Sequence, residues 1–313
     1  MSRTVWVLGE ALMDCVAQAD GSLRPFMGGS PFNMARATAL RGASVGYLNP
    51  LSTDTFGGQM REQLGRDGVR PLLPASRLPT SLAVVQLDNG QPSYGFYREG
   101  VADRDYGVDQ ILTALASVAP GVLHTGSLLL VPPEHEKVIT ILGGAKALGW
   151  TISIDVNLRP KLASDLAQYV LAVQTVAALA DWLKASDEDL ELLGFASPSR
   201  ANAATIARYF TAQGASRVAL TFGGNGAWLE VDGAQAQQDV PTVTLADTVG
   251  AGDTFWGNCL GDWVLQPQGA AERVATTLTE AMNAAAINCT RAGCQPPTYA
   301  EVLAASPAIP AEK

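Results

Sequence analysis

The segment DTVGAGDTF, residues 247–255, places three small residues, Gly250, Ala251 and Gly252, between two aspartates, Asp247 and Asp253. Small residues ahead of a helix let backbone N–H groups approach an anion, and the helix N-terminus adds its positive end. A carboxylate at Asp253 would stay ionised there and point at the bound group. A phosphate donor beside a carboxylate base is the chemistry of phosphoryl transfer to a hydroxyl. A glycine-rich helix start capped by aspartate is the alternative interpretation.

A second glycine pair stands in GGSPFNMARATALRG, residues 28–42. Gly28 and Gly29 precede Asn33 and an amphipathic stretch, and the amide of Asn33 has donors and an acceptor that suit a polyhydroxyl ligand. An ordinary first turn of a helix explains the pattern equally well. The sequence has no Gly-Lys dipeptide for a Walker A motif and no GxGxxG, which disfavours a dinucleotide-binding oxidoreductase. Since His124 and His135 are the only histidines, a carboxylate is the expected general base.

Composition narrows the class of protein. The 313 residues are 47% hydrophobic and 16% charged, which predicts a globular chain with a sizeable core. The net charge of −9 argues against a nucleic-acid partner. No apolar run reaches the roughly 18 residues that span a membrane, and the N-terminal MSRTVWVLGEALMD is interpreted as a first strand, not a signal peptide. The four cysteines form no CxxC, so we expect reduced thiols in a cytoplasmic protein.

Short apolar runs alternate with helical stretches along the chain. We predict strands at 4–9, 43–49, 121–126, 151–156, 181–186 and 217–222, and helices at 33–42, 138–149, 166–180 and 204–215. This alternation predicts an α/β fold, a mostly parallel sheet covered on both faces. Residues 15–27 and 80–98 lack helical periodicity and predict a small β-sheet lid, with a hairpin turn at Asp88-Asn89-Gly90. The last residues, SPAIPAEK, predict a frayed tail.

Open α/β sheets bind ligands at the carboxyl ends of their strands. The segments to examine are therefore those that follow strands: 9–14, 155–159, 186–189, 221–226 and the glycine-rich 247–255.

The two glycine-containing segments together resemble the two signatures of the ribokinase-like (PfkB) sugar kinase family. GEALMD, FYREGVAD, DVNLRP, LKASDEDLELL, TFGGNG and AMNAAAINCTRAGCQPPT also occur in the order typical of that family, across nearly the whole chain. GEALMD, FYREGVAD and DVNLRP are most similar to the fructokinase branch. The resemblance implies one ribokinase-like three-layer α/β/α domain over residues 1–313, with a small β-sheet lid.

The resemblance also implies roles for individual residues. Asp253 would be the catalytic base, and the amides of Gly250, Ala251 and Gly252 would form an anion hole. The implied sugar-binding residues are Asp14, Gly28, Gly29 and Asn33, with Arg98 and Arg159 contacting substrate or phosphates. The implied nucleotide-binding residues are Asn157, Ser186, Thr221, Gly223, Gly226 and Asn283. A surface arginine, a strand-to-loop glycine turn and an ordinary helix residue at Asn283 are the structural alternatives.

The expected cosubstrate is ATP with Mg²⁺. The family's Asn-x-x-Glu motif, tied to Mg²⁺ and phosphate, is represented here by Ser186 and Asp189, and a solvated acidic helix start is the alternative for Asp189. Asp247 matches one ligand of a monovalent-cation site, with K⁺ as the candidate ion. Pro297 stands where ribokinases offer a serine hydroxyl, which weakens that expectation.

The function predicted by resemblance is phosphorylation of D-fructose to fructose 6-phosphate. The two arginines suit a carboxylate equally, so 2-keto-3-deoxygluconate kinase stays open, as does aminoimidazole riboside or ribose kinase. A non-catalytic sugar- or nucleotide-binding regulator on the same fold is the alternative from another class. We expect the lid to close over the sugar and exclude water, and the chain to form a homodimer.

Overall fold

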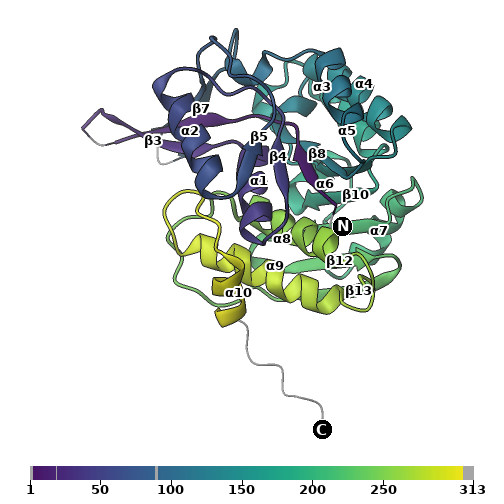
Figure 1. Cartoon of the computed structure of the whole chain (residues 1–313). Coiled ribbons are helices and arrows are strands. Elements are labelled where there is room, and N and C mark those ends of the chain that lie inside the picture. The colour runs from purple at the N-terminus through teal and green to yellow at the C-terminus, as the bar shows by residue number, and fades with distance from the viewer. Residues whose placement is uncertain (1–2, 19, 89–90, 306–313) are drawn as a thin grey trace.

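The computed structural model describes residues 3–18, 20–88 and 91–305. Within this part of the chain, nine strands form a twisted central sheet (Figure 1). From one edge to the other they are β13 (Ala234–Gln238), β12 (Ala227–Val231), β11 (Arg217–Thr221), β10 (Trp182–Ser186), β9 (Thr151–Asp155), β8 (Val122–Gly126), β1 (Val5–Val7), β4 (Val45–Tyr47) and β5 (Val69–Pro71). The strands from β11 to β5 are parallel, whereas β12 and β13 pair antiparallel at the edge.

Helices cover both faces of this sheet, as the alternating sequence pattern predicts. The helices are α1 (Ser30–Leu40), α2 (Thr55–Arg66), α3 (Val108–Ala116), α4 (Glu134–Ala147), α5 (Leu166–Ala177), α6 (Asp187–Leu192), α7 (Ala203–Thr211), α8 (Ala251–Leu265), α9 (Val274–Cys289) and α10 (Tyr299–Ala305). Apolar side chains of α3, α4, α5 and α7 pack into the hydrophobic cluster on one face. Those of α1, α2, α8 and α9 pack into the cluster on the other face. The three-layer α/β/α class is therefore confirmed.

All six predicted strands and all four predicted helices are present. The sequence pattern did not predict β5, which has three residues, or β12 and β13, whose antiparallel ladder follows the glycine turn after β11. The predicted hairpin joins β6 to β7, but Asn89 and Gly90 lie outside the described residues, as does the predicted frayed tail 306–313. The four cysteines are free thiols, as expected.

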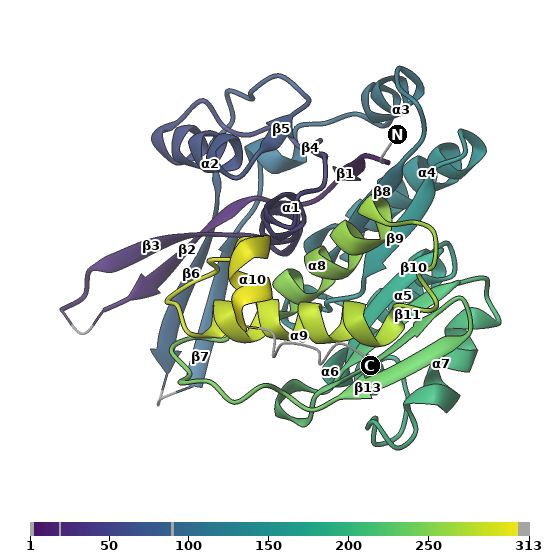
Figure 2. The same ribbon diagram turned by 60° about the horizontal axis from the view of Figure 1, so that its bottom comes forward.

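The segments predicted to form a small sheet do so. In the described chain its strands lie in the order β3 (Leu23–Gly28), β2 (Leu12–Ala17), β6 (Ser81–Asp88) and β7 (Gln91–Tyr97). Two antiparallel hairpins, β2–β3 and β6–β7, join through a parallel pairing of β2 with β6. Figure 2 shows this sheet beside α1, on the opposite side of the molecule from β13. Both hairpins thus meet the main domain next to the segment that contains Gly28 and Gly29.

Candidate active site

The helix α8 begins at the centre of the site. Its N-cap is Gly250, with φ of 75°, and Asp253 lies in its first turn with 7% of its surface exposed. A Cβ atom at Gly250 would lie 2.2 Å from Sγ of Cys294, so both the left-handed backbone and the space require glycine here. The predicted anion-hole amides belong to this turn, in which the N–H of Ala251 donates to the carbonyl of Thr248 at 3.2 Å. The positive end of α8 therefore lies beside the carboxylate of Asp253.

Close packing of α1 on α8 brings the two glycine-containing segments together. A Cβ atom at Gly257 would lie 2.7 Å from Cβ of Ala37, so glycine allows the helices to approach. At the start of α1, Ser30 Oγ donates to Asp253 Oδ1 at 2.7 Å and Asn33 Nδ2 donates to Asp253 Oδ2 at 2.9 Å. Both oxygens of the predicted base are thus held by side chains of α1.

The segment after β9 forms the next side of the site. Asn157, with φ of 39°, donates from Nδ2 to Ser30 Oγ at 2.7 Å, and Arg159 Nη1 donates to Asn157 Oδ1 at 2.6 Å. On β10, the ammonium of Lys184 lies 2.9 Å from each carboxylate oxygen of Asp155. The same ammonium would contact a Cβ atom added at Gly252, at 3.2 Å. A buried positive charge therefore lies directly against the start of α8.

These contacts set the ionisation of the site. Burial raises the pKa of Asp253, while the hydrogen bonds from Ser30 and Asn33 and the charges of Lys184 and Arg159 oppose that rise. Burial alone would lower the pKa of Lys184, but the carboxylates facing it outweigh burial and raise it. Lys184 is therefore an ammonium at neutral pH, and Asp253 keeps donors that favour its carboxylate form.

The predicted sugar-binding residues come from the small sheet and its junction with α1. Asp14 lies on β2, and its carboxylate extends to Gly28 at the end of β3, where a Cβ atom would lie 2.1 Å from Asp14 Oδ2. Burial raises the pKa of Asp14 to about 6, and the charge of Arg159 opposes it. Arg98 follows β7 and donates to Asp103 Oδ2 at 3.1 Å. A contact of Arg98 with substrate or phosphate stays a prediction.

The predicted nucleotide-binding residues lie at neighbouring strand ends and on α9. Ser186 and Thr221 are paired at the carboxyl ends of β10 and β11. Gly223, with φ of 49°, and Gly226, with φ of 90°, form the turn into β12. Asn283 is buried on α9, which packs against α8, β12 and β13. The predicted nucleotide-binding residues are thus divided between these strand ends and a helix that packs directly on α8.

Asp189 and Asp247 each tie backbone segments together. Asp189 accepts the N–H of Leu158 at 2.7 Å and that of Ser186 at 2.8 Å. Asp247 accepts the N–H of Val249 at 3.0 Å and that of Gly293 at 2.8 Å. Their carboxylates therefore fix the loops around the site, and metal contacts through them stay predictions.

Comparison with known proteins identifies the family. A model described as pfkB family carbohydrate kinase matches residues 2–300. The chain belongs to this family. A fructokinase of Rhizobium leguminosarum bv. trifolii is 32% identical over 256 residues, which cover 79% of this chain and 76% of the relative. A fructokinase of Vibrio alginolyticus is 29% identical over 312 residues, 96% of this chain and 97% of the relative.

A solved structure agrees with this assignment. The crystal structure of a fructokinase with bound ATP from Xylella fastidiosa superposes with a TM-score of 0.83 at 26% identity, covering 97% of this chain and 98% of that one. The protein is therefore a carbohydrate kinase, a phosphotransferase that acts on a sugar hydroxyl.

Several residues of this kinase site were not predicted from the sequence. Ser30, Glu10, Asp155 and Lys184 contact the predicted residues or lie directly behind them. The sequence could have indicated a role for Ser30, because its hydroxyl lies between the glycine pair and Asn33. Glu10 carried a weaker signal, an acidic residue in an apolar run. Nothing in the sequence placed Lys184 opposite Gly252, because β10 and α8 are distant along the chain.

The residues described offer no preformed metal centre. No group of three or more His, Cys, Asp or Glu residues within the described ranges is arranged to hold a metal ion. In the same ranges, no helix has the length and apolarity needed to cross a membrane.

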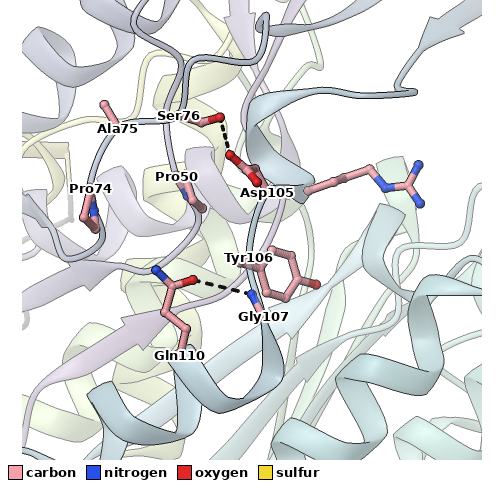
Figure 3. Close-up of a pocket in the computed structure, with 9 residues that line it drawn as sticks. Pro50, Pro74, Ala75, Ser76, Asp105, Tyr106, Gly107 and Gln110 are labelled. Carbon is pink, nitrogen blue, oxygen red and sulfur yellow. Dashed lines mark hydrogen bonds between the residues drawn. The ribbon is translucent and has the colours of Figure 1, made fainter.

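A cavity of about 400 Å³ lies outside the site (Figure 3). Its lining residues are Pro50, Pro74, Ala75, Ser76, Arg104, Asp105, Tyr106, Gly107 and Gln110. Ser76 donates to Asp105, and the N–H of Gly107 donates to Gln110, so these polar groups already satisfy one another. The side chains that hydrogen-bond to Asp253, Ser30 and Asn33, are not among the lining residues.

Proposed function

We propose that the protein transfers the γ-phosphate of ATP to the O6 hydroxyl of D-fructose, with Asp253 as the general base. The observation that carries this proposal is the buried carboxylate of Asp253 in the first turn of α8, held by Ser30 and Asn33. The fructokinases that resemble the chain over most of its length support fructose as the acceptor.

The proposed step balances as a single displacement. Asp253 accepts the proton of the sugar hydroxyl as its oxygen attacks the γ-phosphorus. The bond from that phosphorus to the β–γ bridging oxygen breaks, and ADP leaves. The amides of Gly250, Ala251 and Gly252, the positive end of α8 and the ammonium of Lys184 stabilise the charge that develops.

The sugar site is proposed between the small sheet and α1. Asp14, Gly28, Gly29 and Asn33 would contact sugar hydroxyls, with Arg98 and Arg159 beside the substrate or its phosphate. Asn33 Oδ1 is buried and has no hydrogen-bond partner in the described structure, so it retains an acceptor for a ligand.

ATP is proposed to lie along Asn157, Ser186, Thr221, Gly223, Gly226 and Asn283. Mg²⁺ typically keeps several waters and binds through substrate phosphates with one or two carboxylates. The lack of a preformed cluster among the described residues fits an ion that arrives with ATP. Asp189 would contact it through water, and Asp247 would take part in a K⁺ site.

The small sheet is proposed to close over the sugar, because an open γ-phosphate would be hydrolysed. The observation that supports closure is that Asp14 lies on this sheet and Arg98 follows its last strand. Small-angle scattering curves that superimpose with and without fructose and an ATP analogue would contradict closure. A homodimer and a cytoplasmic location are proposed with it.

The decisive experiment is an ADP-release assay with MgATP, run in KCl and in NaCl. The panel holds fructose, ribose, 2-keto-3-deoxygluconate and aminoimidazole riboside, with Asp253→Asn beside the wild type. We expect fructose-dependent turnover that falls by two or more orders of magnitude in the variant, since a positioned base contributes about 10²–10⁴-fold. Equal rates in both salts would remove the K⁺ proposal.

Each other outcome has a definite meaning. Turnover on another panel member would keep the mechanism and discard fructose. No turnover on any sugar, with ATP binding intact, would contradict the proposed acceptors. An Asp253→Asn variant as active as the wild type would remove Asp253 as the base.

A further inference from the structure

Four polar side chains form an unbroken row that ends at Asp253. Arg159 Nη1 lies 2.6 Å from Asn157 Oδ1, Asn157 Nδ2 lies 2.7 Å from Ser30 Oγ, and Ser30 Oγ lies 2.7 Å from Asp253 Oδ1. The row crosses the segment after β9, the start of α1 and the first turn of α8. Three elements that are distant in the sequence are therefore joined by consecutive short hydrogen bonds.

The chemistry of the groups fixes the direction of every bond in this row. A guanidinium has donors and no acceptor, so Asn157 must turn its carbonyl oxygen toward Arg159. The amide nitrogen of Asn157 then faces Ser30, and because it only donates, Ser30 Oγ must accept. The single hydroxyl proton of Ser30 is left for Asp253, whose carboxylate only accepts. The donors of Arg159 thus orient the Asn157 amide so that Ser30 accepts from Asn157 and donates to Asp253.

We propose that Arg159, Asn157 and Ser30 form a one-way hydrogen-bond relay that holds Asp253 ionised and fixed in place. Ser30 and Asn157 are positioning residues in this relay, and they act on the sugar through Asp253. The inference rests on the proposed function in one respect, that Asp253 is the base of the kinase reaction.

The burial of Ser30 and Asp253, at one end of the row, explains why the relay matters. Ser30 and Asp253 are both about nine-tenths buried, so water does not readily replace a lost donor. Hydrogen bonds to a charged group in such a setting are stronger than neutral ones, and consecutive bonds polarise one another. Loss of the Ser30 hydroxyl leaves the burial of Asp253 less opposed, and its pKa should rise.

Charged and titratable groups, Arg159 of the row among them, also face Asp253, and Ser30→Ala leaves all of them in the chain. They come from β2, from β9 and the segment after it, from β10 and from the segment after α9: Asp14, Asp155, Arg159, Lys184 and Cys294. Because this background is constant, a shift on changing Ser30 reports the hydroxyl itself.

The test is a ¹³C NMR titration of aspartate carboxyl carbons, with Asp253→Asn assigning the signal of Asp253. We expect Ser30→Ala to raise the pKa of Asp253 by about one pH unit, the order of one hydrogen bond to a charged group. Ser30→Thr retains a hydroxyl and should restore the wild-type titration. Thr38→Val is the matched control, because the Thr38 hydroxyl on the same helix bonds only to Met34.

A double variant tests the relay as a unit. Asn157→Gly suits the positive φ of residue 157 and removes the amide that orients Ser30. If Asn157 acts through Ser30, the single variant Asn157→Gly should raise the pKa of Asp253. The same change should cause no further shift when it is added to Ser30→Ala. Additive shifts, or a Ser30→Ala titration that superimposes on the wild type, would overturn the relay.

Failure of the relay is distinguishable from failure of the proposed function, because the titration needs no sugar. The panel assay on the wild type tests the function separately. If a sugar is turned over, kcat can be measured as a function of pH. The apparent pKa on the acid side of that profile should rise in Ser30→Ala by the same amount as the pKa in the NMR titration. Circular dichroism of each variant shows that the fold is retained.

Discussion

Glu10 supports the candidate site through the backbone at the start of α1. It is 1% exposed, and its Oε1 accepts the backbone N–H of Ser30 at 3.2 Å. Burial raises the pKa of Glu10 to about 7, and the charges of Arg98 and Arg159 oppose that rise. The group that fixes the first residue of α1 therefore titrates near neutral pH.

This pKa predicts a pH-dependent stability. Because the pKa of Glu10 is higher in the folded chain than its ordinary 4.5, the folded state binds the extra proton, and ionisation of Glu10 destabilises the fold. That cost is absent below about pH 4.5 and is complete above about pH 7, where it amounts to roughly 3 kcal/mol. Glu10→Gln removes it and keeps an acceptor for Ser30. We expect the variant to be more stable than the wild type at pH 8 and nearly equal at pH 4.5.

Urea unfolding at both pH values measures this difference. Other carboxylates titrate in the same range, but they are common to both proteins, so the difference isolates Glu10. Glu136→Gln on the exposed side of α4 is the matched control and should change stability by less than about 0.5 kcal/mol at either pH. A wild-type to Glu10→Gln difference that is independent of pH would contradict the prediction.

At the scale of single residues, the sequence predicted the residues that belong to motifs. It did not predict the roles of the residues that hold them in place. Asp253, Asn33 and Asp14 were found because their motifs precede or follow predicted elements. The sequence offered signals at Glu10 and Ser30, but their supporting roles appear only in the contacts between segments. Whether an acidic residue in an apolar run points inward depends on the packing of α1 against β1, which periodicity does not specify.

The start of α8 is the element on which the geometry of the candidate site depends most. Gly250→Ala would place a Cβ atom in a left-handed position and 2.2 Å from Cys294 Sγ. We expect a loss of about 1–3 kcal/mol in unfolding free energy and a lower kcat, because the first turn must shift. Thermal unfolding and steady-state kinetics measure the two effects.

Gly143→Ala is the matched control for this change. Gly143 lies in the interior of α4, where an added Cβ atom meets open space. Alanine there should leave kcat unchanged and raise stability by up to about 1 kcal/mol. A Gly250→Ala protein with wild-type melting and kcat would show that the start of α8 tolerates a side chain.

Helices and strands with a clear hydrophobic pattern could be predicted from the sequence. Strands that form only because a neighbouring strand pairs with them could not. The buried strands β8, β9 and β10 are short apolar runs followed by helices, and β11 is an apolar run preceded by α7, which is the pattern of a parallel sheet. By contrast β13, AQAQQ, has no apolar run, and it is a strand because β12 offers it an edge. Pairing partners, rather than residue types, decide such strands.

At the scale of the whole molecule, the parallel β2–β6 ladder joins two segments that are distant in the sequence. It unites two hairpins into one sheet, and that sheet carries Asp14 and leads into Arg98. The sequence indicated β structure in both segments, but their register depends on how each hairpin packs beside α1. The resulting sheet has β3 and β7 as its outer strands.

Those outer strands carry the surface features that favour a dimer. Leu23 on β3 is 48% exposed and Tyr97 on β7 is 63% exposed. Unpaired strand edges and exposed apolar side chains both favour contact with a second copy of the chain. We expect sedimentation equilibrium at micromolar concentration to give twice the chain mass. The double variant Leu23→Asp/Tyr97→Asp should sediment as a monomer, because a carboxylate buried in an interface loses its hydration.

The matched control for this variant is Leu171→Asp. Leu171 lies on α5 with 64% of its surface exposed and is distant from the small sheet in the chain and in the fold. This variant should remain a dimer, since a charge on an exposed helix face has no interface to disrupt. A wild type that sediments as one chain, or a double variant that stays paired, would show that the small sheet is not a dimer interface. If the double variant is a monomer with unchanged kcat but a higher KM for the sugar, the partner chain stabilises the closed position of the small sheet rather than the chemistry at Asp253.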